Sequence, residues 1–70
     1  MSDVKITCKL RDRRLERGIS IRELEKKTGI GRGHISLYER GEKDMHVKTA
    51  AKFAVILECT LDDLFEITRV

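Results

Sequence analysis

The chain has 70 residues, of which 40% are hydrophobic and 39% are charged, and its formal net charge is +3 at pH 7. A chain of this length closes one small core, which argues against a deep substrate cavity and predicts a single domain over residues 1–70. No apolar run approaches the roughly 20 residues of a membrane span, and residues 1–5 lack an apolar signal region, so we expect a cytoplasmic protein with no membrane partner.

The first expected helix covers residues 7–17. Ile6, Leu10 and Arg14 recur at four-residue spacing, which places them on one helical face. Gly18 follows as a left-handed cap. This face is apolar except for Arg14, so a positive charge is expected to point toward the core.

The second helix is expected to begin after Ser20, because Ser20 and Glu23 form the Ser-x-x-Glu pattern of a capping box. Gly29 ends it at a sharp turn that favours positive φ. The side chains predicted to face inward are those of Ile21, Leu24 and Thr28.

The third helix is expected over residues 31–40, with Gly41 ending it. Ile35, Tyr38 and Glu39 share its inner face. Residues 42–46 then form a polar connection. Two short helices around the turn at Gly29 are the plan of a DNA-binding helix-turn-helix, with the outer side of the third helix as its reading face.

A fourth helix is expected over residues 47–57, and Thr60 caps a last short helix with Asp62 and Asp63 in its first turn. Its apolar face would be Leu61, Leu64 and Phe65. The predicted inner face of the fourth helix consists of Val47, Ala50, Ala51, Ala54 and Leu57. The fold expected is therefore all-α, with five helices.

The two ends alternate between apolar and polar residues, at residues 4–6 and 67–70. We interpret residues 1–6 and 67–70 as frayed termini flanking a core at 9–65. Two alternatives remain open: a short two-stranded β-ribbon, or a tail that reaches a partner subunit.

Arg14 and Glu39 each place a charge on an otherwise apolar inner face. A lone charge facing a core is costly, whereas opposite charges on two converging helices satisfy each other through a bidentate contact. We therefore predict a partly buried Arg14–Glu39 ion pair. The alternative is that both side chains extend to solvent.

Together these motifs resemble the lambda-repressor-like Cro/repressor (XRE-type) helix-turn-helix domain over about residues 9–65. The resemblance implies sequence-specific binding of an operator in double-stranded DNA by a two-fold dimer, with the third helix in the major groove and half-sites roughly 34–36 Å apart. The family also has an Arg–Glu pair at the positions of Arg14 and Glu39. The residues that carry the resemblance are Leu10, Arg11, Arg14, Arg17, Gly18, Ile19, Ser20, Glu23, Leu24, Gly29, Ile30, Ile35, Ser36, Glu39, Arg40, Gly41, Thr49, Ala54, Leu57 and residues 61–65.

The chain departs from the family pattern in and around the helix-turn-helix. Ile21 replaces a frequent Gln that touches a phosphate, and Glu25 replaces the usual Ala, so its long side chain must bend outward or find a donor. Gly31 replaces a capping Ser, Gly33 replaces a residue that often reads bases, and Met45 stands where Pro is familiar.

The resemblance also selects candidate base-reading residues. Arg32, in the first turn of the recognition helix, can bond O6 and N7 of guanine; a phosphate contact or plain solvation are the alternatives. Gly33 lets the backbone approach the groove, and Ser36 follows on the same side. Leu37 is expected to be exposed, either to touch a thymine methyl group or as an ordinary surface residue.

Phosphate contacts are expected around this helix from Ser20, Arg22, His34, Arg40 and Lys43, although each could equally be solvated. The free amides at the start of the second helix could also bind an anion. Residues 1–43 contain twelve Lys/Arg and seven Asp/Glu, and residues 44–70 contain three and five. This asymmetry suits a polyanionic partner.

The remaining chemistry-bearing residues do not form a site in the sequence. Cys8, Cys59, His34 and His46 lack metal-ligand spacing, and we interpret both thiols as small buried hydrophobes. No nucleophile–base pattern is present, so we expect no enzyme, cofactor, metal or small-molecule ligand.

The function predicted is that of a small repressor-like transcriptional regulator. The alternative is a protein-interaction module such as an antitoxin or adaptor. A homodimer is expected through the last helix and the tail, at Leu64, Ile67 and Val70, because the reading side must stay free.

Overall fold

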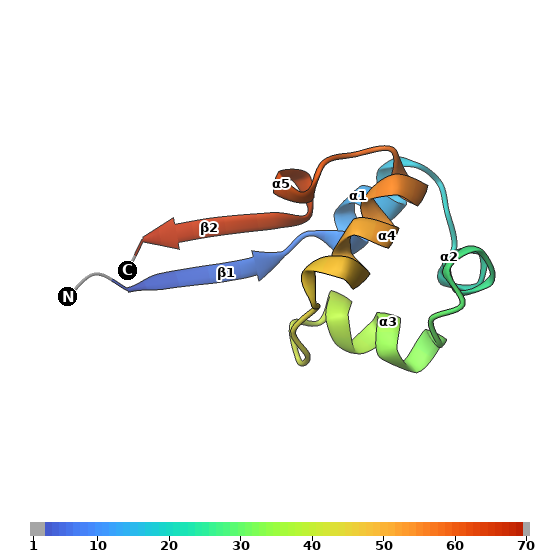
Figure 1. Ribbon diagram of the computed structural model, residues 1–70, viewed down its shortest axis with the longest axis horizontal. Coiled ribbons are helices and arrows are strands. Elements are labelled where there is room, and N and C mark those ends of the chain that lie inside the picture. Colours follow the sequence, from blue (N-terminus) through green and yellow to red (C-terminus); the bar gives the residue numbers. More distant parts are fainter. Residues whose placement is uncertain (1–2, 70) are drawn as a thin grey trace.

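Five helices form a body from which a two-stranded antiparallel ribbon projects (Figure 1). The computed structural model describes residues 3–69. The projecting ribbon makes the molecule elongated, with extents of 42 × 21 × 19 Å. In chain order the elements are β1 (Val4–Cys8), α1 (Leu10–Glu16), α2 (Ile21–Thr28), α3 (Arg32–Glu39), α4 (Val47–Leu57), α5 (Leu61–Leu64) and β2 (Phe65–Arg69).

Local capping sets the bounds of α2. The Ser20 hydroxyl accepts the N–H of Glu23 at 3.0 Å, and the Glu23 carboxylate lies against the N–H of Ser20, so the predicted capping box is confirmed. Gly29 ends the helix with φ 77°, a left-handed conformation that other residues rarely adopt. The turn between α2 and α3 therefore depends on this glycine.

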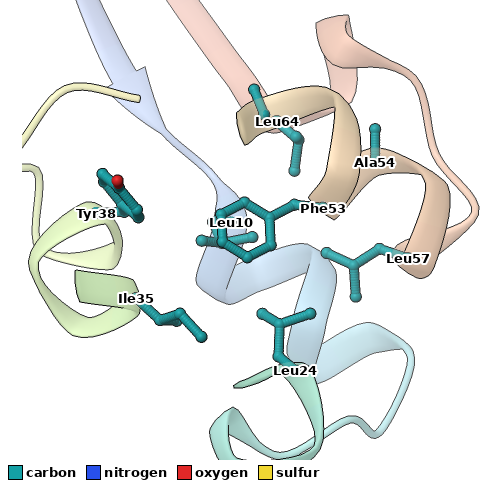
Figure 2. Close-up of a cluster of buried hydrophobic side chains, with 9 residues drawn as sticks. Leu10, Leu24, Ile35, Tyr38, Phe53, Ala54, Leu57 and Leu64 are labelled. Carbon is teal, nitrogen blue, oxygen red and sulfur yellow. The ribbon is translucent and has the colours of Figure 1, made fainter. Parts of the chain in front are cut away.

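The core lies where all five helices meet. Figure 2 shows the Phe53 ring in the middle of the cluster, with Leu24 of α2 and Ile35 of α3 on one side and Leu64 on the other. The rings of Tyr38 and Phe53 meet edge to face, with centroids 6.2 Å apart. The buried apolar residues are Leu10, Leu24, Ile35, Tyr38, Ala50, Phe53, Ala54, Leu57 and Leu64.

The inner face predicted for α4 was partly wrong. Val47 is 74% exposed, and Phe53, which the prediction omitted, is fully buried. A stripe starting at residue 47 and one starting at residue 50 have the same helical spacing. The period alone therefore could not choose between them, and tertiary packing selects the later one.

The chain ends form the ribbon rather than frayed termini. β1 and β2 pair antiparallel from Val4 opposite Arg69 to Cys8 opposite Phe65. As a result α1 begins at Leu10 rather than at residue 7, and Phe65 belongs to β2 rather than to the last helix. Strand pairing gives these backbone groups partners that a frayed end would lack. Val70 lies outside the described residues.

One ion pair joins α1 to α3. Arg14 Nε donates to Glu39 Oε2 at 2.7 Å and Arg14 Nη2 donates to Glu39 Oε1 at 3.3 Å, which makes the contact bidentate. The third guanidinium nitrogen, Nη1, donates to the carbonyl of Ile19 at 2.9 Å. The Arg14 and Glu39 side chains are 9% and 6% exposed. The ion pair that the sequence predicted is therefore present and nearly buried.

Removing either partner of this pair leaves the other charge buried and unpaired. We expect Arg14→Met and Glu39→Met each to lower the free energy of unfolding by about 3 kcal/mol. The double variant should lose much less than the two losses combined, because neither charge then remains. Urea unfolding of the four proteins gives the coupling energy; strictly additive losses would contradict the contact.

The four-residue helix α5 is held by a second capping box. The Asp63 carboxylate accepts the N–H of Thr60 at 3.0 Å, and the Thr60 hydroxyl accepts the N–H of Asp63 at 3.3 Å. The hydrogen bond that the Thr60 N–H donates to the carboxylate, together with a hydrogen bond from the Thr60 side chain, lowers the pKa of Asp63 from its ordinary 3.8.

A lowered carboxyl pKa contributes stability above the unfolded-state value, and that contribution is lost as the pH falls through the folded-state value. We therefore expect the free energy of unfolding of the wild type to fall more steeply below pH 3.8 than that of Asp63→Asn. Parallel urea unfolding series at acid pH measure the difference. Identical pH profiles would show that the Asp63 carboxylate is not engaged.

Candidate nucleic-acid interface

The packing of α3 leaves one of its sides open. Ile35 and Tyr38 are buried in the core and Glu39 is held by Arg14, so these three residues define the inner side. The helical period places residues 33, 37 and 40 roughly opposite Ile35, with residues 36 and 32 at the edge of that side toward Glu39. We call this set, Arg32, Gly33, Ser36, Leu37 and Arg40, the outer face of α3.

The outer face is not uniformly exposed. Arg32, Gly33 and Arg40 are exposed, whereas Ser36 and Leu37 are half-buried. The expectation of an exposed Leu37 was therefore wrong. Its carbonyl accepts the N–H of Glu42 at 2.9 Å, so the chain after α3 folds back beside it. This return of the chain is set by Gly41, with φ 73°.

Arg32 has a partner on the neighbouring helix. The Glu25 carboxylate accepts the backbone N–H of Arg32 at 3.0 Å through Oε2, and Oε1 lies 3.4 Å from Arg32 Nε. The residue before α3 is Gly31, which has no side chain to cap the helix. Glu25 therefore supplies, from α2, an acceptor for the first N–H of α3, at a helix start where Gly31 offers no side-chain acceptor.

A second group of donors lies beyond the end of α3. Lys43 Nζ is 3.4 Å from Nδ1 of His34 and 5.9 Å from the centroid of the Tyr38 ring. The structure thus brings His34 and Lys43 together. Arg40 pairs with Glu42 at 2.6 Å, and both side chains are more than half exposed. An ion pair this exposed is weak and easily exchanged for another acceptor.

The start of α2 offers fewer free groups than expected. The Ser20 hydroxyl and the Glu23 carboxylate are engaged in the capping box, so neither is an unoccupied anion site. The N–H groups of Ile21 and Arg22 belong to the first turn, which has no acceptors within the helix. Arg22 is exposed, and within residues 3–69 no carboxylate pairs with it.

The cysteines lie away from this face. Cys8 and Cys59 are half-buried and unbridged, and burial raises the pKa of both thiols from 9.0. Both thiols are therefore protonated at neutral pH, which makes them poor nucleophiles and poor metal ligands. In the part of the chain that the structure describes, no three His, Cys, Asp or Glu side chains gather around a common metal position. Nor is any described helix long and apolar enough to cross a membrane.

These elements match those of a known family. A sequence model described as helix-turn-helix matches residues 10–64, from the first residue of α1 to the last residue of α5. The chain belongs to the XRE-type helix-turn-helix family. It is 40% identical over 52 residues to the SPbeta prophage-derived uncharacterized HTH-type transcriptional regulator YopS of Bacillus subtilis (strain 168), covering 73% of this chain and 70% of that protein. The family places the chain among the DNA-binding transcription regulators.

The helix-turn-helix contains one site residue whose role sequence reasoning missed. Glu25 was seen only as a departure that needed a donor, and the donor turns out to be Arg32 itself. Two signals together could have identified it. Gly31 leaves the helix start without a hydroxyl, and Glu25 lies one turn of α2 before the glycine at position 29, close to that start.

Proposed function

We propose that this protein binds operator DNA as a two-fold dimer, with α3 in the major groove, and represses transcription. The observation that carries the proposal is the outer face of α3, which is left open by the core and begins with an exposed arginine. A helix with one open, basic side fits the major groove, whose base edges carry the code that distinguishes all four base pairs. A dimer seated on an operator that overlaps a promoter would exclude other proteins from that site.

Base reading is assigned to Arg32, Gly33, Ser36 and Leu37. Arg32 is 57% exposed and presents a planar fork of donors that matches O6 and N7 of guanine. Gly33 carries no side chain and has open space around its Cβ position, so the backbone can approach the groove closely. The half-buried Leu37 retains enough surface to touch a thymine methyl group.

Phosphate contacts are assigned to basic groups on both sides of the outer face. Arg22 lies at the start of α2, and His34, Arg40 and Lys43 lie along and beyond α3. Ser20 contributes by fixing the first turn of α2, whose free N–H groups can meet a phosphate. Such contacts set the register of the protein on the duplex without reading sequence.

The dimer surface is assigned to the ribbon. Ile6 pairs with Ile67 across the two strands, so both side chains lie on one face of the ribbon, and they are 61% and 69% exposed. A groove of about 610 Å³ adjoins this face, lined by these two residues and Met45, Val47, Leu61 and Phe65 among others. A two-stranded ribbon is marginally stable alone, and a second copy of the chain would cover its apolar face.

Two of the interface residues expected from the sequence need comment. Leu64 is fully buried in the core, so it cannot contact a partner, and that expectation was wrong. Leu64 is the last residue of α5 and faces the core, and the chain continues directly from it into β2. Val70 lies outside the described residues. Ile67 therefore remains a candidate interface residue, and Ile6, its partner across the two strands, is added as a second one.

Selection of bound duplexes from random DNA tests the function directly. We expect the wild type to select a two-fold symmetric site whose half-sites contain guanine, with centres roughly 34–36 Å apart. Arg32→Ala should lose about 1–3 kcal/mol of discrimination at one guanine and keep its preferences elsewhere. No binding to any duplex at low salt would contradict the proposal and favour the protein-interaction alternative.

Sedimentation equilibrium tests the dimer. We expect the wild type to form a dimer, and Ile67→Lys to shift it to monomer because a charge would be buried in the apolar contact. Thr68→Lys is the matched control, since Thr68 is exposed and lies on the opposite face of the ribbon. A wild type that is monomeric even when bound to the operator would overturn the two-fold arrangement.

A further inference from the structure

We propose that Glu25 positions the Arg32 side chain for guanine, and so sets base specificity without touching DNA. This inference rests on the proposed reading of a base by Arg32. It follows from one arrangement in the structure: one carboxylate on α2 contacts both the backbone N–H and the side chain of the same residue on α3, at 3.0 and 3.4 Å.

The two contacts have different consequences. The backbone contact fixes the carboxylate relative to the first turn of α3, since the N–H of Arg32 belongs to the helix itself. The side-chain contact then joins the Arg32 guanidinium to that fixed point. Arg32 is 57% exposed and Glu25 37% exposed, so the pair adds little to stability. Its effect is on the orientation of Arg32.

The atom that Glu25 engages determines which donors remain. Oε1 lies near Nε of Arg32, which leaves the terminal Nη1 and Nη2 groups unengaged by Glu25. Guanine needs two parallel N–H donors for O6 and N7, and these terminal groups provide them. An arginine held at Nε loses less rotamer freedom when it binds, because part of that freedom is already lost in the free protein.

The negative charge of Glu25 also favours contact with guanine over contact with phosphate at the start of α3. The first turn of α3 contains no acidic residue of its own, so its N–H groups and Arg32 would attract any phosphate. The Glu25 carboxylate opposes that attraction at the start of α3. Non-specific backbone binding is thereby weakened at this position, whereas a guanine edge, which carries no net charge, is affected less.

The test compares two duplexes that differ at the guanine assigned to Arg32 by the Arg32→Ala selection. The measured quantity is the ratio of the dissociation constants for the duplex without and with that guanine. In Glu25→Gln, an amide oxygen can still accept the N–H of Arg32, but the charge that holds Nε is gone. We expect the ratio to fall about three- to tenfold, the scale of ordering one long side chain.

Two further variants separate positioning from folding and from net charge. Glu25→Ala combined with Gly31→Ser removes the carboxylate but supplies a capping hydroxyl, and a Cβ added at position 31 meets no atom within 4 Å. We expect the same fall in the ratio, with thermal unfolding showing an intact fold. Glu66→Gln removes one carboxylate from the ribbon, on the far side of the body from the start of α3 (Figure 1), and should leave the ratio unchanged.

A purely structural role for Glu25 would weaken both duplexes equally and leave the ratio unchanged, which would overturn the inference. A ratio that rises in Glu25→Gln would also overturn it, because Glu25 would then compete with guanine for Arg32. Failure of the proposed function looks different. The wild type itself would then bind no duplex, or Arg32→Ala would lose no guanine preference.

Discussion

The ion pair between Arg14 and Glu39 is the interaction on which the position of α3 depends. One guanidinium binds the carboxylate at the end of α3 through two nitrogens and the carbonyl of Ile19, just before α2, through the third. The end of α3 and Ile19, which precedes α2, are thereby fixed to the same side chain of α1. Apolar packing around Phe53 favours compactness but is non-directional. The bidentate geometry of the ion pair adds direction, and so determines which side of α3 is left exposed.

Much of this arrangement follows from local signals in the sequence. Three local features predicted α2, α3 and their connection to α1: the Ser20–Glu23 capping box, the turn at Gly29 and the charges on two inner faces. Each of these features depends on residues of defined type at short spacing within a helix or turn. The ends of the chain were misassigned because a short alternating run acquires its partner only through a pairing across more than 50 residues. For α4 two helical stripes were equally periodic, and only the shape of the core placed Phe53 inside.

The candidate site was less predictable than the fold. The burial of Ile35 and Tyr38 was predicted from the sequence and is confirmed, but the sequence did not show that Glu25 reaches across the turn to Arg32. The glycine at position 31 and the carboxylate one turn before Gly29 indicate that the two are close, but not the geometry in which the two helices approach each other. The outcome links two departures from the family pattern: the carboxylate at position 25 accepts the first N–H of α3, at a helix start where position 31 has no hydroxyl. The first turn of α3 is thus ordered by a side chain of the neighbouring helix.

In the complex that we propose, the outer face of α3 and the start of α2 meet DNA while the ribbon does not. Backbone amide chemical shifts, measured by NMR as a selected operator duplex is titrated into the protein, test this claim most directly. The account predicts the largest changes at Arg22 and residues 32–37, with Thr68 of the ribbon almost unchanged. Changes concentrated on the ribbon, with α3 unaffected at saturating duplex, would contradict it.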